Sequence, residues 1–202
     1  MESLIQAIVA LLAIANPLGA AVVFAGLTEE MSRAERRGAA LRASAAVLAI
    51  LAAAALAGTR ILEAFGVSLP AFQVGGGLVI VLMGLEMLRG SPTQVQHEPA
   101  SDRAQDSILV PFAMPLVAGP GSITTVVTLA TRAGGWRAQL GVLIAIAVTS
   151  GVLLGTLLVS AWIDDRVGER GLRIFLRFLG LILVAVGAEF VLGGTREYLR
   201  LS

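Results

Sequence analysis

The chain has 202 residues, of which 56% are hydrophobic and 14% are charged, with a mean hydropathy of +0.86. Soluble domains are about 45 to 50% apolar and about 25% charged, so we expect an integral membrane protein surrounded by the lipid bilayer. The net charge is +1 and the charges cluster between apolar runs, which argues against a nucleic-acid partner. The sequence contains no cysteine, which excludes disulfides and thiolate chemistry.

A membrane-spanning helix needs about 20 mostly apolar residues. The chain has six such runs, at about 4–28, 39–58, 70–89, 107–130, 138–162 and 172–192. The first run lacks a basic leader and continues through Phe24, so we expect it to be retained rather than cleaved as a signal peptide. The sequence therefore predicts an all-α polytopic membrane protein with six transmembrane helices in one membrane domain, 1–202.

Proline interrupts the first and the fourth run at matching places. Pro17 lies in Ile14-Ala15-Asn16-Pro17-Leu18-Gly19, and Pro120 lies 103 positions later in Val117-Ala118-Gly119-Pro120-Gly121-Ser122. A proline removes a helix hydrogen bond, and broken backbone is tolerated at membrane depth only where protein buries it or it lines a polar cavity. A matched pair of broken segments points to a transporter's binding site. We therefore expect helices 1 and 4 to be broken around such a site.

The same offset of 103 residues recurs beyond the prolines. It pairs Thr28 with Thr131, Phe72 with Phe175, Gly77 with Gly180, Leu78 with Leu181, Val81 with Val184, Gly84 with Gly187, Glu86 with Glu189 and Gly90 with Gly193. Each half holds an odd number of spans, so the two halves are predicted to be inverted repeats. We place repeat 1 at about 1–90, a polar cytoplasmic linker at about 91–106 and repeat 2 at about 107–202. Inverted repeats suit alternating access but also occur in channels.

Arginine is distributed unevenly between the two sides of the predicted bundle. Ten arginines fall on one side, namely Arg33, Arg36, Arg37, Arg42, Arg89, Arg103, Arg166, Arg170, Arg173 and Arg177, and the other five fall on the opposite side. The richer side is expected to be cytoplasmic, which places both termini outside the cytoplasm. The charged stretches 29–37 and 164–173 are expected to be cytoplasmic loops.

The two breaks supply the candidate substrate-binding residues. A broken helix offers N–H groups that suit a carboxylate and carbonyl groups that suit a cation, and the neighbouring side chains add hydroxyl and amide groups. The candidate set is Asn16, Pro17, Gly19, Gly119, Pro120, Gly121, Ser122, Thr124 and Thr125. Together these groups could hold a small zwitterion. The alternative is that the prolines only kink packed helices, while the polar side chains satisfy the freed backbone.

Glu86 and Glu189 are acids inside later spans, and intramembrane carboxylates are functional candidates by default. They are our candidates for binding a coupling proton. Both lie near the predicted ends of their helices, so pairing or capping at the membrane interface is the alternative. Gln73, near the start of the third span, is expected to snorkel to the interface, and a position in the cavity is the alternative.

The spaced glycines of the later spans are expected to allow close helix contact, either within one chain or between copies in a homo-oligomer. They are Gly77 with Gly84, Gly180 with Gly187, and Gly151 with Gly155. We expect no enzyme activity, no metal and no cofactor. The sole histidine, His97, lies in the linker, and the sequence contains neither a zinc-protease H-E-x-x-H motif nor a P-loop.

Three motifs in order resemble the MarC family of inner-membrane proteins, related to the neutral amino acid transporters called SnatA. They are 16–19 (Asn-Pro-Leu-Gly), 65–72 (Phe-Gly-Val-Ser-Leu-Pro-Ala-Phe) and 115–125 (Pro-Leu-Val-Ala-Gly-Pro-Gly-Ser-Ile-Thr-Thr). The resemblance implies an inverted-repeat fold with outward termini, and proton-driven transport of small neutral amino acids such as glycine and alanine. It also implies that the residues around the two breaks lie near the substrate. The family pattern often has Asp where Glu86 stands, so the resemblance does not support a coupling role for Glu86.

Two other classes stay open from the sequence. One is a channel or exporter for another small polar solute, and the other is a structural membrane protein without transport. The sequence does not fix the substrate, the direction of transport, the coupling ion, the oligomeric state or the resting conformation.

Overall fold

The computed structural model describes residues 2–29, 31–89 and 117–201. This part of the chain contains seven helices and no strand. The helices are α1 (Glu2–Ala15), α2 (Pro17–Leu27), α3 (Arg33–Ala64), α4 (Leu69–Arg89), α6 (Pro120–Arg132), α7 (Trp136–Leu158) and α8 (Ser160–Leu201). The predicted all-α class is confirmed.

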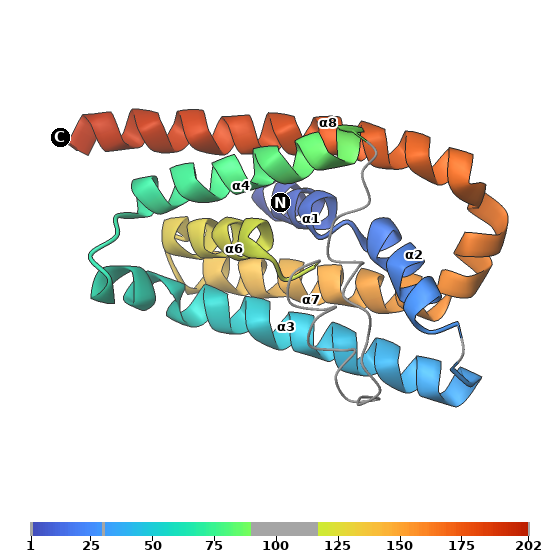
Figure 1. The fold of residues 1–202 in the computed structure, drawn as a ribbon. Helices are drawn as coiled ribbons and strands as arrows, with labels where there is room; N and C mark the ends of the chain where they lie inside the picture. Colours follow the sequence, from blue (N-terminus) through green and yellow to red (C-terminus); the bar gives the residue numbers. More distant parts are fainter. Residues whose placement is uncertain (1, 30, 90–116, 202) are drawn as a thin grey trace.

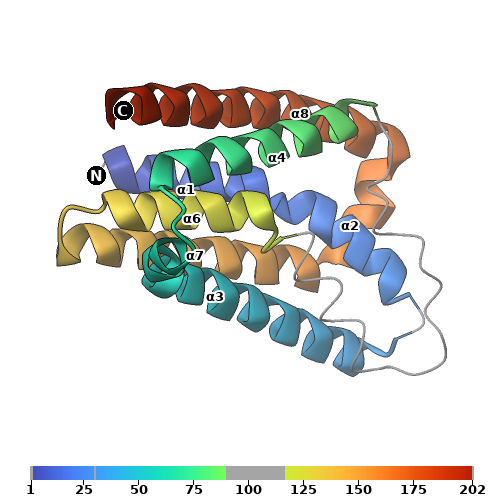
Figure 2. The same cartoon turned by 60° about the vertical axis from the view of Figure 1, so that its left-hand side comes forward.

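The helices form three layers, with the broken ones in the middle (Figures 1 and 2). The pair α4 and α8 covers one side, and the pair α3 and α7 covers the other. Between them lie α1, α2 and α6, which contact helices of both outer layers. Figure 2 shows both ends of the described chain on the same side of the bundle, which we call the terminus side.

Local sequence signals set the ends of the long helix α3. Ser32 and Glu35 form a capping box, in which the Ser32 hydroxyl accepts from the Glu35 N–H and the Glu35 carboxylate accepts from the Ser32 N–H. At the other end Gly66 takes a left-handed conformation, with φ 67°. The Gly66 N–H then bonds to the Glu63 carbonyl and the Val67 N–H to the Leu62 carbonyl. This is the Schellman arrangement, which satisfies carbonyls that the helix end leaves unpaired.

Five helical stretches are long and apolar enough to cross a membrane. They are Leu4–Leu27, Arg33–Ala64, Leu69–Arg89, Trp136–Leu158 and Ile174–Arg200, and they correspond to five of the six predicted spans. The remaining predicted span, 107–130, is described only from residue 117 onward, and its first half lies outside the described residues. The helix α6 is therefore the second half of that span.

The prediction of a loop at 164–173 is wrong, because these residues lie inside the 42-residue helix α8. At about 1.5 Å per residue, a helix of this length is about twice as long as the roughly 30 Å hydrocarbon layer is thick. Figure 1 shows that α8 bends after α7 before it runs back along α4. Charged residues do not by themselves end a helix, and this stretch contains no proline that would.

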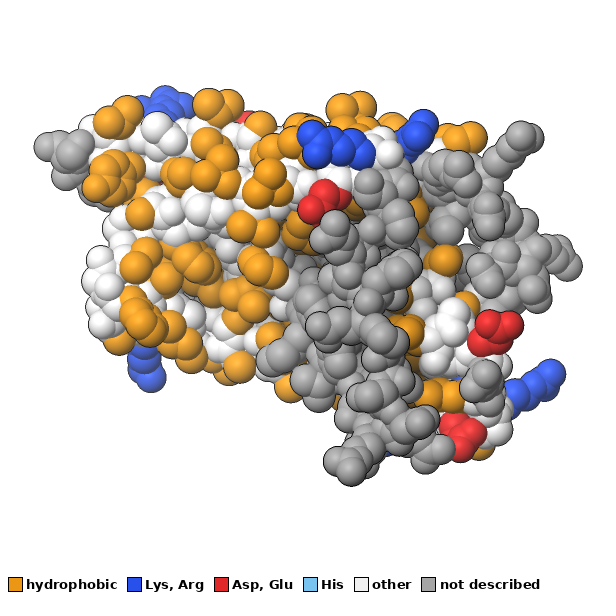
Figure 3. All heavy atoms as spheres, in the orientation of Figure 1, with side chains coloured by type: hydrophobic (Ala, Val, Ile, Leu, Met, Phe, Trp, Pro, Cys, Tyr) orange, Lys and Arg blue, Asp and Glu red, His pale blue; other side chains and the backbone are white. Residues whose placement is uncertain are grey.

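Apolar side chains cover the outer faces of the bundle. Leu48 and Leu56 on α3, Leu82 on α4 and Leu181 on α8 are all exposed. Figure 3 shows that side chains of this kind dominate the described part of one face. An exposed apolar surface of this extent is unfavourable in water but is what lipid chains require. The chain is therefore an integral membrane protein.

The pair of helices α4 and α8 crosses at four glycines. A Cβ atom built on Gly77 would lie 2.7 Å from the Gly187 carbonyl oxygen, and one built on Gly84 would lie 2.6 Å from the Gly180 carbonyl oxygen. Since real Cβ atoms do not approach this closely, only glycine fits at these positions. The close contact expected from Gly77, Gly84, Gly180 and Gly187 is confirmed.

This crossing is symmetric under the offset of 103. The offset carries Gly77 to Gly180 and Gly84 to Gly187, so it exchanges the two glycine contacts with each other. Antiparallel helices related in this way are what an inverted repeat requires. By contrast, no atom of the described residues lies within 4 Å of the position that a Cβ would take on Gly151 or Gly155. The prediction that Gly151 and Gly155 make a close contact is therefore wrong within the part of one chain that the structure describes.

We expect Gly77→Ala to destabilise the protein, because its methyl group would overlap the backbone of α8. Overpacking of this kind costs about 2 kcal/mol, which corresponds to a melting temperature lower by about 5 °C. Gly75→Ala is the matched control, since nothing lies within 4 Å of a Cβ there. Thermal melting of both variants in detergent tests this, and equal melting temperatures would contradict the crossing.

Candidate functional site

The first helix break is made by Asn16. The helix α1 ends at Ala15 and α2 begins at Pro17, while Asn16 between them is left-handed, with φ 44° and ψ 63°. Asparagine tolerates this conformation better than most residues. Its side-chain Oδ1 accepts a hydrogen bond of 3.1 Å from the Gly19 N–H. The break is thus stabilised by an N-cap from its own side chain.

Gly19 is required by this cap. A Cβ built on Gly19 would overlap the amide group of Asn16. Gly19 belongs to the candidate substrate-binding set, but in the described conformation the Asn16 side chain occupies the space beside its backbone.

The second break is capped differently. The helix α6 begins at Pro120, and its N-cap residue Gly119 provides no side-chain hydrogen bond. Ser122 is buried, and its Oγ donates to the Val117 carbonyl oxygen at 2.7 Å. That hydroxyl therefore satisfies the carbonyl end of the break and leaves the N–H end without a side-chain cap.

The two breaks touch each other in the middle layer. A Cβ built on Gly121 would lie 3.2 Å from Ile14 Cγ2 and 2.9 Å from Ile80 Cγ1. Gly121 belongs to the first turn of α6, and Ile14 belongs to the last turn of α1. The first turn of α6 therefore packs against the side chain of Ile14 in the last turn of α1, which brings the positive end of α6 near the negative end of α1.

Backbone carbonyls are freed beside this contact. Pro17 has no N–H, so it cannot donate to the carbonyl of Ala13 four residues earlier. The Asn16 N–H bonds to the Leu12 carbonyl at 3.0 Å, which is the last helical bond of this kind before the break. The N–H groups of α6 and the freed carbonyls of α1 are the polar groups that a small zwitterion needs.

The threonines of the candidate set are both buried. Thr125 Oγ1 donates to the Gly121 carbonyl at 2.9 Å, within α6. Thr124 packs against Gly76 of α4, where a Cβ on the glycine would overlap the Thr124 side chain. The structure thus brings Asn16, Gly119, Gly121, Ser122 and Thr125 to the breaks and places Thr124 at the contact of α6 with α4.

Glu86 and Glu189 lie elsewhere. Both are exposed on the outer face of the pair α4 and α8, whereas the residues of the breaks, apart from the exposed Pro120, are buried or half-buried. Glu189 is also further from a helix end than we expected, because α8 continues to Leu201. The interfacial position of Glu189 was expected because the predicted span ended at about residue 192, nine residues before the observed end of α8. The coupling role of both residues stays a prediction.

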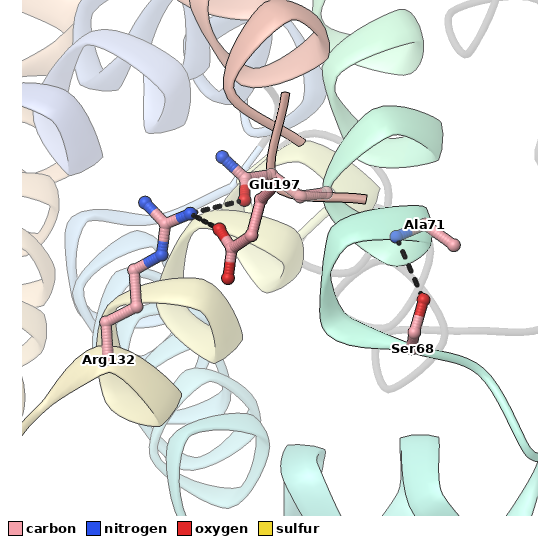
Figure 4. A network of polar contacts seen from close by, with 5 residues as sticks. Ser68, Ala71, Arg132 and Glu197 are labelled. Carbon is pink, nitrogen blue, oxygen red and sulfur yellow. Dashed lines mark hydrogen bonds and ion pairs between the residues drawn. The ribbon is translucent and has the colours of Figure 1, made fainter. Parts of the chain in front are cut away.

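Sequence reasoning missed a polar network on the terminus side. Arg132, at the end of α6, donates through Nη2 to Gln73 Oε1 of α4 at 2.9 Å and forms an ion pair with Glu197 of α8. Figure 4 shows Arg132 and Glu197 pointing toward each other. Gln73 is only 4% exposed, so it points into the bundle and does not snorkel outward to the membrane interface. The sequence feature that could have indicated this network is Gln73 itself, a glutamine among apolar residues.

A surface cavity adjoins this network. It has a volume of about 290 Å³ and is lined by Gly193, Arg196, Glu197 and Arg200 on the last turns of α8. Beside the two breaks Ile14 and Val117 are 1% and 0% exposed, whereas Asn16 and Pro17 are half-buried and Pro120 is exposed. The breaks are therefore buried only in part.

We expect Gly19→Ala to expel the Asn16 amide from its capping position. Loss of an N-cap costs about 1 kcal/mol, so the amide hydrogens in the first turn of α2 should exchange about fivefold faster. Gly26→Ala in the same helix is the control, since its Cβ would meet no atom within 4 Å. Hydrogen exchange read by mass spectrometry measures both. Unchanged exchange in Gly19→Ala would show that the cap does not hold this break.

Comparisons with known proteins cover nearly the whole chain. Residues 1–199 match the sequence profile described as MarC family integral membrane protein. A membrane protein of Methanocaldococcus jannaschii is 37% identical over 199 residues, which cover 97% of both chains. The inner membrane protein MarC of Citrobacter koseri is 34% identical over 209 residues, which cover 96% of this chain and 94% of the relative.

A membrane protein of Aquifex aeolicus is 34% identical over 200 residues, which cover 97% of this chain and 94% of the relative. No solved structure matches the chain significantly. The names of these three relatives state no substrate. On the sequence profile and these full-length relatives, the chain belongs to the MarC family of integral membrane proteins.

Proposed function

We propose that the chain is a secondary transporter of small neutral amino acids, of the size of glycine and alanine, that works by alternating access. The observation that carries this proposal is the contact between the two breaks. The uncapped N-terminal turn of α6 lies against the C-terminal turn of α1, inside the protein. Opposite partial charges on two neighbouring helix ends suit a ligand that carries both charges itself.

The two ends of an amino acid fit the two helix ends. Its carboxylate would accept from the N–H groups of Gly121 and Ser122, which suit an anion. Its ammonium group would donate to the carbonyls that Pro17 frees at the end of α1. The other break is less suited to the carboxylate, because the Asn16 amide already occupies the first turn of α2. The described conformation would therefore bind the carboxylate at α6.

Tight packing limits the size of the ligand. Gly121 leaves no room for even one added carbon before Ile80 must move. The groups around the breaks are aliphatic side chains, such as Ile14, Leu18 and Val117, together with small polar ones, and they do not form a large aromatic pocket for drug-like solutes. The aromatic content of the whole chain, 5%, points the same way. A glycine-sized or alanine-sized solute fits this packing best.

The energy source and the orientation belong to the same proposal. We assign the coupling to the proton gradient and place both termini outside the cytoplasm, as the arginine distribution favours. Glu86 and Glu189 are the acidic candidates for the coupling proton. The chain would act without a cofactor and without enzymatic chemistry.

The first test is uptake of labelled glycine and alanine into proteoliposomes that contain the purified protein. We expect saturable uptake that an inward proton gradient increases and that shows counterflow. Flux that neither saturates nor shows counterflow would favour a channel. The absence of uptake and of any ligand-dependent rise in melting temperature, for folded protein, would favour a structural membrane protein.

The second test places the site. We expect Gly121→Ala to lower kcat/KM for glycine about tenfold, because the added methyl group separates α6 from α1 where the ligand binds. Gly151→Ala makes the same change at an exposed glycine with no neighbour within 4 Å, and it should transport normally. Equal transport by the two variants would show that the substrate does not bind at the breaks. Alanine already displaces Ile80 slightly and a bulkier residue would displace it further, so alanine is the sharper probe.

A further inference from the structure

The half-helix α6 is clamped on two sides over its whole length. On one side Gly58 of α3 packs against Val127, where a Cβ on the glycine would overlap the valine. On the other side Gly76 of α4 packs against Thr124 in the same way. A hydrogen bond of 2.8 Å joins the hydroxyls of Thr59 and Thr131 near the end of α6. The path from the breaks toward the terminus side is therefore filled by α6.

The network around Arg132 closes the end of this clamp. It joins α6 to α4 through the buried Gln73 and to α8 through Glu197. The Arg132 and Glu197 side chains are 48% and 41% exposed, and ion pairs this exposed are weak. A weak contact suits a gate, which has to open in every transport cycle, better than it suits a structural anchor.

Two of the three network positions hold different residues in the opposite half of the protein. In the repeat, Arg132 corresponds to Glu29 and Gln73 corresponds to Leu176. A carboxylate and a leucine cannot reproduce the hydrogen bond between a guanidinium and an amide. The clamp glycines are not repeated either, because Gly58 corresponds to Ala161 and Gly76 corresponds to Leu179.

We propose that Gln73, Arg132 and Glu197 are the gate on the terminus side, and that this gate sets the resting conformation of the transporter. The inference rests on the proposed function. Two inverted repeats of identical sequence would open to either side with the same free energy, so a preference requires a difference between the halves. The gate and the clamp glycines provide that difference, and they hold the terminus side closed. The substrate-free protein then opens toward the linker side more readily.

A single cysteine can report on the gate, because the chain contains none of its own. Thr128 lies on α6 between the breaks and the gate, is 3% exposed, and has a hydroxyl with no hydrogen-bond partner among the described residues. Thr128→Cys therefore changes little and becomes reactive only when the terminus side opens. The rate of labelling by a membrane-impermeant maleimide, in lipid nanodiscs that expose both faces, measures this opening.

We expect Glu197→Gln in the Thr128→Cys background to be labelled about fivefold to tenfold faster than Thr128→Cys alone. Glu63→Gln is the matched control, because it neutralises an exposed acid at the end of α3 outside the network. The reversed pair Arg132→Glu with Glu197→Arg should restore slow labelling. Equal labelling rates in Glu197→Gln and Glu63→Gln would overturn the proposal. Faster labelling of Glu197→Gln together with a lower melting temperature would also overturn it, because it would indicate a general loss of packing.

Hydrogen exchange gives a second measurement that needs no cysteine. We expect the amides of α6 to exchange more slowly than those of its counterpart α2, and Glu197→Gln to raise exchange in α6 alone. Exchange in α6 as fast as in α2 would overturn the proposal. Neither measurement requires transport. If the gate variants behave as expected but no amino acid is taken up, the proposed function fails; if uptake is found but labelling is unchanged, only the gate fails.

Discussion

The structure depends on one constraint, which is that backbone hydrogen bonds lost within a membrane cannot be replaced by water. The chain departs from helical geometry in the interior of the bundle only at Asn16 and around Gly119, among the residues described. Both departures lie in the middle layer, between the pair α4 and α8 and the pair α3 and α7. Side chains then satisfy part of what the breaks expose, through Asn16 on an N–H group and Ser122 on a carbonyl. The two outer pairs of helices separate the broken helices from the lipid, where unpaired backbone groups would be costly.

The two breaks use equivalent positions in opposite ways. At the first break the polar side chain is at the N-cap, Asn16, and glycine is three residues later. At the second break glycine is at the N-cap and the polar side chain, Ser122, is three residues later. The exchange leaves one helix end capped by its own chain and the other end open at its N–H groups. Function in an inverted repeat has to reside in such differences, because the symmetric part of the structure treats both sides of the membrane alike.

The sequence predicted what depends on local pattern and missed what depends on distant side chains. Proline and the offset of 103 located both breaks and the glycine crossing, because each has a direct backbone consequence. The gate joins Arg132 to Gln73, which is 59 positions earlier, and to Glu197, which is 65 positions later. No rule of sequence spacing predicts contacts between residues so far apart. Arg132 was counted as a loop residue for orientation, although it ends a helix that the bundle encloses. Gly151 and Gly155 show the converse, since their spacing is typical of a helix contact that one chain does not make.

The exposed positions of Glu86 and Glu189 restrict how a proton could be coupled to transport. A coupling carboxylate must be held in different surroundings in the two states, because otherwise it binds the proton equally in both. In an inverted repeat the transition exchanges the surroundings of equivalent residues, and these two residues are equivalent. Both are already exposed on the outer face of α4 and α8, so the exchange gives neither of them new surroundings. Coupling at these carboxylates would therefore require that face to be covered asymmetrically, as a second copy of the chain would do.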